Sequence, residues 1–300
     1  YRHRMEHHDP PAPGFALDPA DESSWRPALG AFDRAGDWEV LFRRQLSEHP
    51  WPDVVTEWWP RLLPGLFGRL THGLIRTAHA VRSVAGAGEP NPIQLGELAR
   101  GLAFWAAGYT ALPGRSHLTG SATVAGAVAA LPRRATDDSQ GSPGLGSHPG
   151  YLSGLDALAP GKADELLSDM TTTFAGVYLA HPEVAPVPLV HGVTAPAAIW
   201  LVLPYLPERL RLATVAVMWQ SHLALLLRFT SSTAGENDIA RSASETETPP
   251  VAGLIARALD HGDEHVIKFT EAVLREHALR PDARFLPAVV AAQHRIPRYP

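Results

Sequence analysis

An uncharged apolar segment of the chain runs from Leu212 to Leu227 and is interrupted by Gln220, Ser221 and His222. It is shorter than the roughly 20 residues that a helix needs to cross a bilayer. We therefore expect a buried core helix, which other apolar helices must cover. Alternating patterns typical of strands are scarce in the rest of the chain. The sequence thus predicts an all-α fold.

The composition, with 45% hydrophobic and only 19% charged residues, suits one large domain or two packed lobes, and we expect one large helical domain over residues 1–300. Two segments depart from this composition. Residues 132–150 are rich in Arg, Asp, Ser, Gly and Pro, which predicts a long loop or lid. Residues 230–250 are poor in hydrophobic side chains, which predicts a mobile insert. The chain starts without Met, as expected if its N-terminal part is incomplete.

Start and stop signals place the remaining helices. They are predicted at 37–48, 66–84, 94–109, 121–131, 162–179, 208–229 and 282–293. Thr194 followed by Pro196 is typical of a helix start, which predicts a helix from there to about Leu206. Residues 261–272 contain no Pro and repeat apolar residues at helical spacing, so they are predicted to form one continuous helix.

Charge and motif content argue against several classes of protein. The net charge is −5 and the pI is about 6.3, so no basic excess favours binding to nucleic acid or an anionic membrane. The chain has no Cys, which excludes disulfides, thiolate metal sites, iron–sulfur clusters and a Cys nucleophile, and fits a cytoplasmic location. Gly-x-Gly-x-x-Gly, the phosphate-loop pattern and Gly-x-Ser-x-Gly are absent, so a Rossmann-type nucleotide site has no support.

Three polar side chains repeat along the stretch from residue 261. His261, His265 and Lys268 stand at i, i+4 and i+7, which places them within a sector of about 60° on one helix. Helix-borne imidazoles at this spacing can share a metal ion. The alternative is a solvated face, because Glu264 and Lys268 form a favourable i, i+4 pair.

A second group repeats the same spacing on the helix predicted at 66–84. His72, Arg76 and His79 form a polar stripe in an otherwise apolar sequence. Such a stripe either faces water or is satisfied inside the protein. Arg76 would suit an anionic or quinone-like oxygen, whereas it would repel a metal ion.

A third candidate, His191, is predicted to lie just before the helix that Thr194 would cap. The positive end of a helix dipole disfavours a charged imidazole, so His191 would be neutral, as ligation requires. The alternative is a capping or core histidine. His222, inside the apolar segment, is predicted to be a core histidine bonded to a neighbouring carbonyl.

At these residues the chain resembles the bacterial, actinomycete-like members of the questin oxidase family. The matching stretches are 58–64, with two Trp before Pro, and the motifs around the histidines at 72–79, 191–196 and 263–272. The resemblance covers most of residues 50–295. It implies an oxidoreductase, an oxygenase that opens the ring of an anthraquinone-type aromatic polyketide, with a formal Baeyer–Villiger or dioxygenase outcome.

The resemblance also implies a non-haem iron held by histidines and by a lysine carboxylated on its amine. The ligand roles then fall on His72, His191, His265 and Lys268. His79, His261 and Arg76 would lie around the metal or in the substrate pocket. Family members carry an Asn-His segment upstream of the point where this chain begins, and the sequence leaves open whether that segment supplies another ligand.

A carboxylated lysine has a clear physical origin. A buried amine beside a cation loses its proton, and the neutral amine captures CO2 to give an anionic carbamate. Histidine and oxygen ligands suit Fe(II) and leave room for O2. NADPH or a reductase partner would supply electrons. Two alternatives stay open: a metal-free, NADPH-dependent Baeyer–Villiger-type monooxygenase, and a non-catalytic helical protein that binds hydrophobic aromatics. The sequence does not indicate an oligomeric state.

Overall fold

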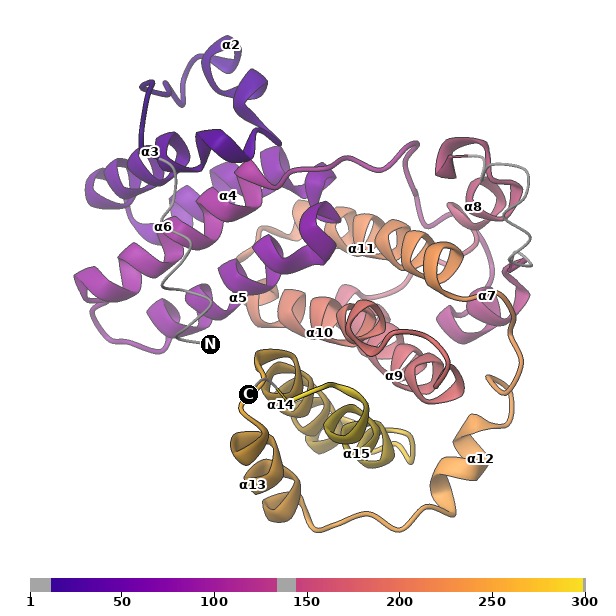
Figure 1. The fold of residues 1–300 in the computed structure, drawn as a ribbon. Helices are drawn as coiled ribbons and strands as arrows, with labels where there is room; N and C mark the ends of the chain where they lie inside the picture. The colour runs from indigo at the N-terminus through magenta and orange to yellow at the C-terminus, as the bar shows by residue number, and fades with distance from the viewer. Residues whose placement is uncertain (1–11, 134–143, 299–300) are drawn as a thin grey trace. The chain divides into compact units, whose positions relative to one another are not determined.

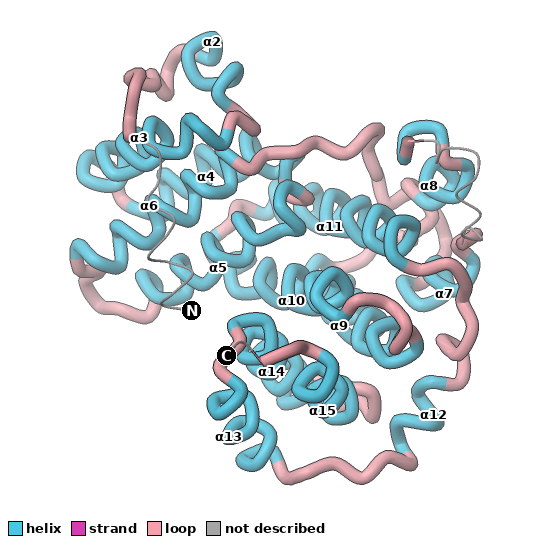
Figure 2. Tube along the Cα trace, in the orientation of Figure 1, coloured by secondary structure: helices cyan, strands magenta, loops and turns pink. Residues whose placement is uncertain are grey.

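The computed structural model describes residues 12–133 and 144–298. These residues form fourteen α-helices joined by 3-10 turns and loops, without a strand (Figures 1 and 2). The predicted all-α fold is therefore confirmed. Close contacts group the described residues into an N-terminal unit, 12–112 and 198–217, and a C-terminal unit, 113–133, 144–197 and 218–298. The single domain expected from composition stays a prediction.

The N-terminal unit is built on five α-helices that precede residue 112. They are α2 (Glu22–Trp25), α3 (Ala35–Glu48), α4 (Trp51–Leu62), α5 (His72–Ala85) and α6 (Pro92–Ala107). Helix α6 packs against α3 and α5. It begins at a capping box, in which the Asn91 side chain accepts from the backbone of Gln94 and the Gln94 side chain accepts from the backbone of Asn91.

Aromatic rings fill the core of this unit. Trp58 is fully buried and makes edge contacts with Trp25, Trp38 and Phe42, at centroid distances of 5.4, 5.6 and 5.0 Å. Helices α5 and α6 touch along their backbones, because a Cβ at Gly73 would lie 2.5 Å from the Cα of Trp105. This contact holds the first turn of α5, where His72 lies.

The C-terminal unit contains seven helices of its own. They are α7 (Val124–Ala130), α8 (Pro149–Gly154), α9 (Ala163–Ala180), α12 (Ile239–Ser244), α13 (Val251–His261), α14 (Glu264–Leu279) and α15 (Phe285–Arg295). Helix α9 packs against α7, α12, α14 and α15. Helix α14 also packs against α13 and α15, so α9 and α14 carry most of the packing in this unit.

The boundary between the units falls inside α10 (Pro186–Val202) and α11 (Glu208–Phe229). By length and composition alone, α11 and the stretch Pro186–Tyr205, which is α10 with the 3-10 turn after it, are apolar enough to cross a membrane. In each, however, 72% of the most apolar window is buried inside the protein, which is the burial of a core helix. The bounds of α11 are those that the sequence predicts.

Two predicted helix starts are wrong. The helix expected from residue 66 begins at His72, because Arg69, Leu70 and Thr71 adopt left-handed backbone angles, with φ of 48°, 52° and 65°. The helix expected to start at Thr194 begins at Pro186. Its interior accommodates Pro196, so the local start signal is overridden by a longer apolar helix.

The two segments predicted to be irregular are partly ordered. Most of the loop predicted at 132–150 falls on residues 134–143, outside the described residues, and α8 begins at Pro149. The insert predicted at 230–250 contains α12, and its Glu236 is buried in an ion pair with Arg133. The mobility of this insert stays a prediction.

Candidate metal centre

The stretch predicted to be one continuous helix from residue 261 is two helices. Helix α13 ends at His261, and Gly262 follows it in a left-handed conformation with φ of 77°. Asp263 then caps α14, because its Oδ1 accepts from the backbone N–H of His265 at 2.8 Å. The single-helix prediction is therefore wrong: glycine ends the first helix and aspartate starts the second.

The break separates His261 from the other two members of its group. His261 is 7% exposed, and its Nε2 lies 3.0 Å from the carbonyl oxygen of Ile296, to which it donates. It therefore ties the end of α13 to the residue that follows α15. His265 and Lys268 remain one turn apart on α14. A role of His261 beside a substrate stays a prediction.

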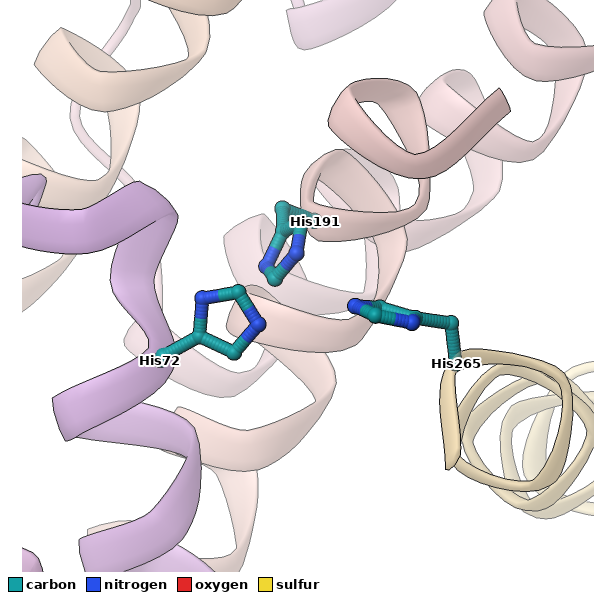
Figure 3. Close-up of side chains that lie close together, drawn as sticks. All are labelled: His72, His191 and His265. Atoms are coloured by element: carbon teal, nitrogen blue, oxygen red, sulfur yellow. The ribbon is translucent and has the colours of Figure 1, made fainter. Parts of the chain in front are cut away.

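Within the C-terminal unit, His191 of α10 and His265 of α14 lie side by side. Figure 3 shows the two rings pointing toward one another. Their centroids are 5.8 Å apart with an interplanar angle of 74°, and a nitrogen of each ring lies within 4.8 Å of the other. They are 1% and 7% exposed. Two shielded imidazoles from different helices thus meet, close to the spacing of ligands that share an ion through bonds of about 2.1 Å.

The protonation of His265 is set by its surroundings. Burial lowers the pKa of His265, and the nearby charge of Lys268 lowers it further. The ring is therefore neutral near pH 7, which is the form that binds metals. Its Nδ1 lies 3.2 Å from Oδ1 of Asp263, a buried carboxylate. Because a carboxylate accepts, we assign the proton to Nδ1, which leaves the Nε2 lone pair for a ligand.

Asp263 therefore has two contacts with His265, one to its backbone and one to its ring. Asp263 belongs to the motif at 263–272, but the motif alone predicts no role for it. Its position gives a signal, since an Asp that follows a helix-ending Gly is a common N-cap. Asp263, Glu264 and His265 also offer ligand atoms within 4.8 Å of one another, so a carboxylate could itself join a metal on this side.

Lys268 lies one turn beyond His265 and is half-buried. Its effect on the pKa of His265 is that of a nearby positive charge. The same charge would repel a metal ion, so Lys268 can act as a ligand only after losing its proton or its cationic character. This requirement is consistent with the carbamate that the family resemblance implies, and the ligand role of Lys268 stays a prediction.

Arg275, which the sequence analysis did not single out, connects the two helices of the histidine pair. It lies on α14 and donates from Nη2 to the carbonyl of Ala197 on α10 at 2.9 Å. Its Nε also contacts Glu271 at 3.3 Å. The helix that carries His265 is thereby tied to the helix that carries His191.

His191 lies inside α10 and does not precede a helix, which corrects the predicted N-terminal position. Thr194 does not cap: its Oγ1 donates to the carbonyl of Val190 at 3.1 Å, four residues back. The helix dipole at an N-terminus therefore does not account for the state of His191. The His191 side chain is instead enclosed by the protein, with 1% of its surface exposed.

His222 of α11 is the core histidine that the sequence predicts. Its Nε2 lies 2.8 Å from the carbonyl oxygen of Gly192, and its ring stacks on Phe174 with centroids 3.7 Å apart. Complete burial lowers the pKa of His222 to about 3, so the ring is neutral. The predicted bond to a neighbouring carbonyl is confirmed.

The second histidine group lies in the N-terminal unit. His72, also drawn in Figure 3, is the first residue of α5, and its Nδ1 lies 2.5 Å from the carbonyl oxygen of Arg69. Nδ1 therefore carries the proton, so a metal would have to bind through Nε2. The left-handed segment that precedes His72 brings the Arg69 carbonyl to this position. The assignment of His72 as a ligand rests on its sequence motif.

The rest of the stripe on α5 has the predicted helical spacing. Arg76 forms a bidentate pair with Glu97 of α6, with distances of 2.7 and 3.0 Å. The charge of Arg76 is thus largely offset, so a substrate oxygen would compete with Glu97 for it. His79 is half-buried one turn further on. The substrate roles of Arg76 and His79 stay predictions.

No protein-family model matches the sequence, and no curated protein is significantly similar to it. Function must therefore be inferred from the residues of the site. In the C-terminal unit, the group best suited to bind a metal is the His191–His265 pair. Asp263 contacts Nδ1 of His265, and Lys268 lies one turn further along α14.

Proposed function

We propose that this chain is a metal-dependent oxygenase that binds a non-haem iron and oxidises the ring of an anthraquinone-type aromatic polyketide. The observation that carries the proposal is the buried approach of His191 and His265, with ring centroids 5.8 Å apart. Two buried imidazoles that meet away from water are typical of a metal site. The choice of iron and of substrate class follows from the resemblance to questin oxidases.

The donor set fits a divalent metal that prefers nitrogen and oxygen ligands. His191 and His265 would hold the ion from the C-terminal unit. Lys268, as a carbamate, would add an anionic oxygen, and His72 would add a third imidazole. The chain has no cysteine, so metals that require thiolate ligands are disfavoured. A bound Fe(II) would supply the capacity to bind and activate O2, with NADPH or a reductase as the electron source.

The residues of the chain have distinct tasks in this proposal. Asp263 holds a proton on Nδ1 of His265 and so directs Nε2 toward the ion. Burial of both rings keeps water from competing for the ligand positions. Arg76 would bind a phenolate or quinone oxygen of the substrate, with Glu97 limiting its charge. His79 and His261 would line the substrate pocket.

The decisive experiment is metal analysis of protein that is purified without chelator and reconstituted anaerobically with Fe(II). We expect about one iron per chain in the wild type and a large loss in His265→Ala. His294→Ala is the matched control, because His294 is an exposed histidine on α15 and its loss should leave iron content unchanged. Titration calorimetry with Fe(II) on the metal-free proteins compares the metal affinities of the wild type and the two variants.

Two other outcomes identify the alternatives. Metal-free protein that consumes NADPH and O2 with an anthraquinone would indicate a metal-independent monooxygenase. Protein that binds an aromatic polyketide but neither binds metal nor turns over would indicate a non-catalytic binding protein. Equal iron content in His265→Ala and wild type would exclude the site described here.

A further inference from the structure

His222 contacts the helix that carries His191 through the backbone of that helix. Its Nε2 donates to the carbonyl of Gly192 at 2.8 Å, and Gly192 is the residue directly after His191. The His222 ring is fully buried and stacks on Phe174, with an interplanar angle of 17°. This stack fixes the direction of the Nε2–H bond. Among the described residues, Nδ1 of His222 has no partner, so the bond to Gly192 is its single hydrogen bond.

The Gly192 carbonyl needs a donor because of Pro196. In an α-helix the carbonyl of residue i accepts from the N–H of residue i+4. For Gly192 that residue is Pro196, which has no N–H, although α10 continues to Val202. The imidazole of His222 supplies the missing donor from the neighbouring helix.

Gly192 also has a steric role in this contact. A Cβ at residue 192 would lie 2.1 Å from Cδ1 of Phe174, which is too close for any residue other than glycine. Glycine therefore lets the Phe174–His222 stack reach the backbone of α10. Val190, the residue before His191, accepts a hydrogen bond at its carbonyl from the Thr194 hydroxyl. The carbonyls on both sides of His191 are therefore bonded by side chains.

We propose that His222 is a positioning residue for His191: its Nε2–H replaces the helical donor that Pro196 lacks, and this bond sets the turn of α10 that directs the His191 ring toward His265. The inference rests on the proposed function, since it gives His191 a ligand role. His222 itself would not be a ligand, because it is not among the histidines whose ligand atoms lie close together.

The test uses a substitution and a rescue. His222→Phe keeps an aromatic ring on Phe174 but removes the donor, and we expect the affinity for Co(II), measured by calorimetry on metal-free protein, to fall about tenfold or more. Adding Pro196→Ala returns an N–H at residue 196 to the Gly192 carbonyl, and this double variant should recover most of the affinity. Pro196→Ala alone is the matched control and should bind Co(II) like the wild type.

A purely structural role would give a different pattern. In that case His222→Phe would melt at a lower temperature but bind Co(II) with unchanged affinity, which would overturn the proposal. Failure of Pro196→Ala to rescue the affinity would also overturn it. If His222→Phe does not fold, His222→Gln, which retains an N–H donor, is expected to fold and to bind Co(II) within a few-fold of the wild type. Weak Co(II) binding by folded His222→Gln, no stronger than that of His265→Ala, would count against the proposal.

A metal-free readout separates this proposal from the proposed function. The ¹⁵N resonances of the His191 ring, assigned by their loss in His191→Gln, should shift in His222→Phe and return in the double variant. Wild-type protein that binds no Co(II) or Fe(II) would refute the metal site. Unchanged His191 resonances in His222→Phe would refute the positioning role, whatever the result for metal.

Discussion

His181, which follows α9, hydrogen-bonds through Nε2 to Glu236 of the 230–250 segment at 2.8 Å, with both side chains buried. Arg133 donates to the same carboxylate at 3.1 and 3.2 Å. Glu183 accepts from the other ring nitrogen of His181, and Arg295 donates to the His181 carbonyl. The polar 230–250 segment is therefore attached to the rest of the C-terminal unit by a buried ion-pair network.

This network predicts a pH dependence of stability. The hydrogen bond to Glu236 raises the pKa of His181 above its ordinary value. Protonated His181 therefore stabilises the folded state. This stabilisation is complete below the unfolded pKa of about 6.5 and is lost as pH rises through the folded pKa. As pH rises from the unfolded to the folded pKa of His181, we expect the melting temperature of the wild type to fall relative to that of His181→Gln. If the melting temperatures of the two proteins differ by a constant amount from pH 5 to 9, the network does not titrate in this way.

Asp263 allows its capping and orienting functions to be separated. Asn retains an oxygen that can cap α14, but it lacks the charge that holds the proton on Nδ1 of His265. We expect Asp263→Asn to lower metal affinity about 10- to 100-fold with little change in unfolding free energy. Asp263→Ala should lose about 1 kcal/mol of stability as well. Calorimetry and urea denaturation measure the two effects, and equal metal affinity in Asp263→Asn would contradict the orienting role.

Lys268 can be tested with a matched control, because the chain contains only two lysines. The other, Lys162, is exposed and pairs with Glu165. With ¹³C-bicarbonate and metal present, we expect a carbamate carbon resonance in the wild type and in Lys162→Ala, and none in Lys268→Ala. Metal affinity should rise with bicarbonate concentration only where Lys268 is present. A metal-loaded wild type without the resonance would rule out carboxylation.

The contact between α5 and α6 predicts a large difference between two glycine substitutions. A Cβ at Gly73 would lie 2.5 Å from backbone of Trp105, whereas a Cβ at Gly88 would meet nothing within 4 Å. We expect Gly73→Ala to lower the free energy of unfolding by about 1–3 kcal/mol, because backbone atoms cannot move aside cheaply. Gly88→Ala should change it by less than about 0.5 kcal/mol. Denaturant titration of both variants would show whether the helices touch as described.

The fold class and the core helices were accessible from the sequence because they depend on apolar periodicity. The bounds of α11 follow from its apolar run, and a histidine inside that run predicts a bond to some carbonyl without identifying Gly192. The absence of Pro wrongly predicts a continuous helix across Gly262, whereas Gly and Asp together mark a helix end and a new start.

Other features had no local signal. Pro196 is tolerated inside α10 because a side chain from another helix satisfies the freed carbonyl, and that partner lies 30 residues away in sequence. The left-handed run at 69–71 contains no glycine, so its residues are held by tertiary contacts, such as the Arg69 guanidinium 3.7 Å above the Phe32 ring. Sequence periodicity does not report contacts of this kind.

The left-handed run has a practical consequence for attempts to make this protein more heat-resistant. Each non-glycine residue in that conformation costs about 1 kcal/mol or more, so glycine at 69, 70 or 71 would relieve strain. The same replacement would loosen the turn whose carbonyl fixes the His72 ring. A screen that selects only for thermal tolerance would therefore favour variants here at the expense of the His72 ring position, so such a screen should score metal binding alongside survival.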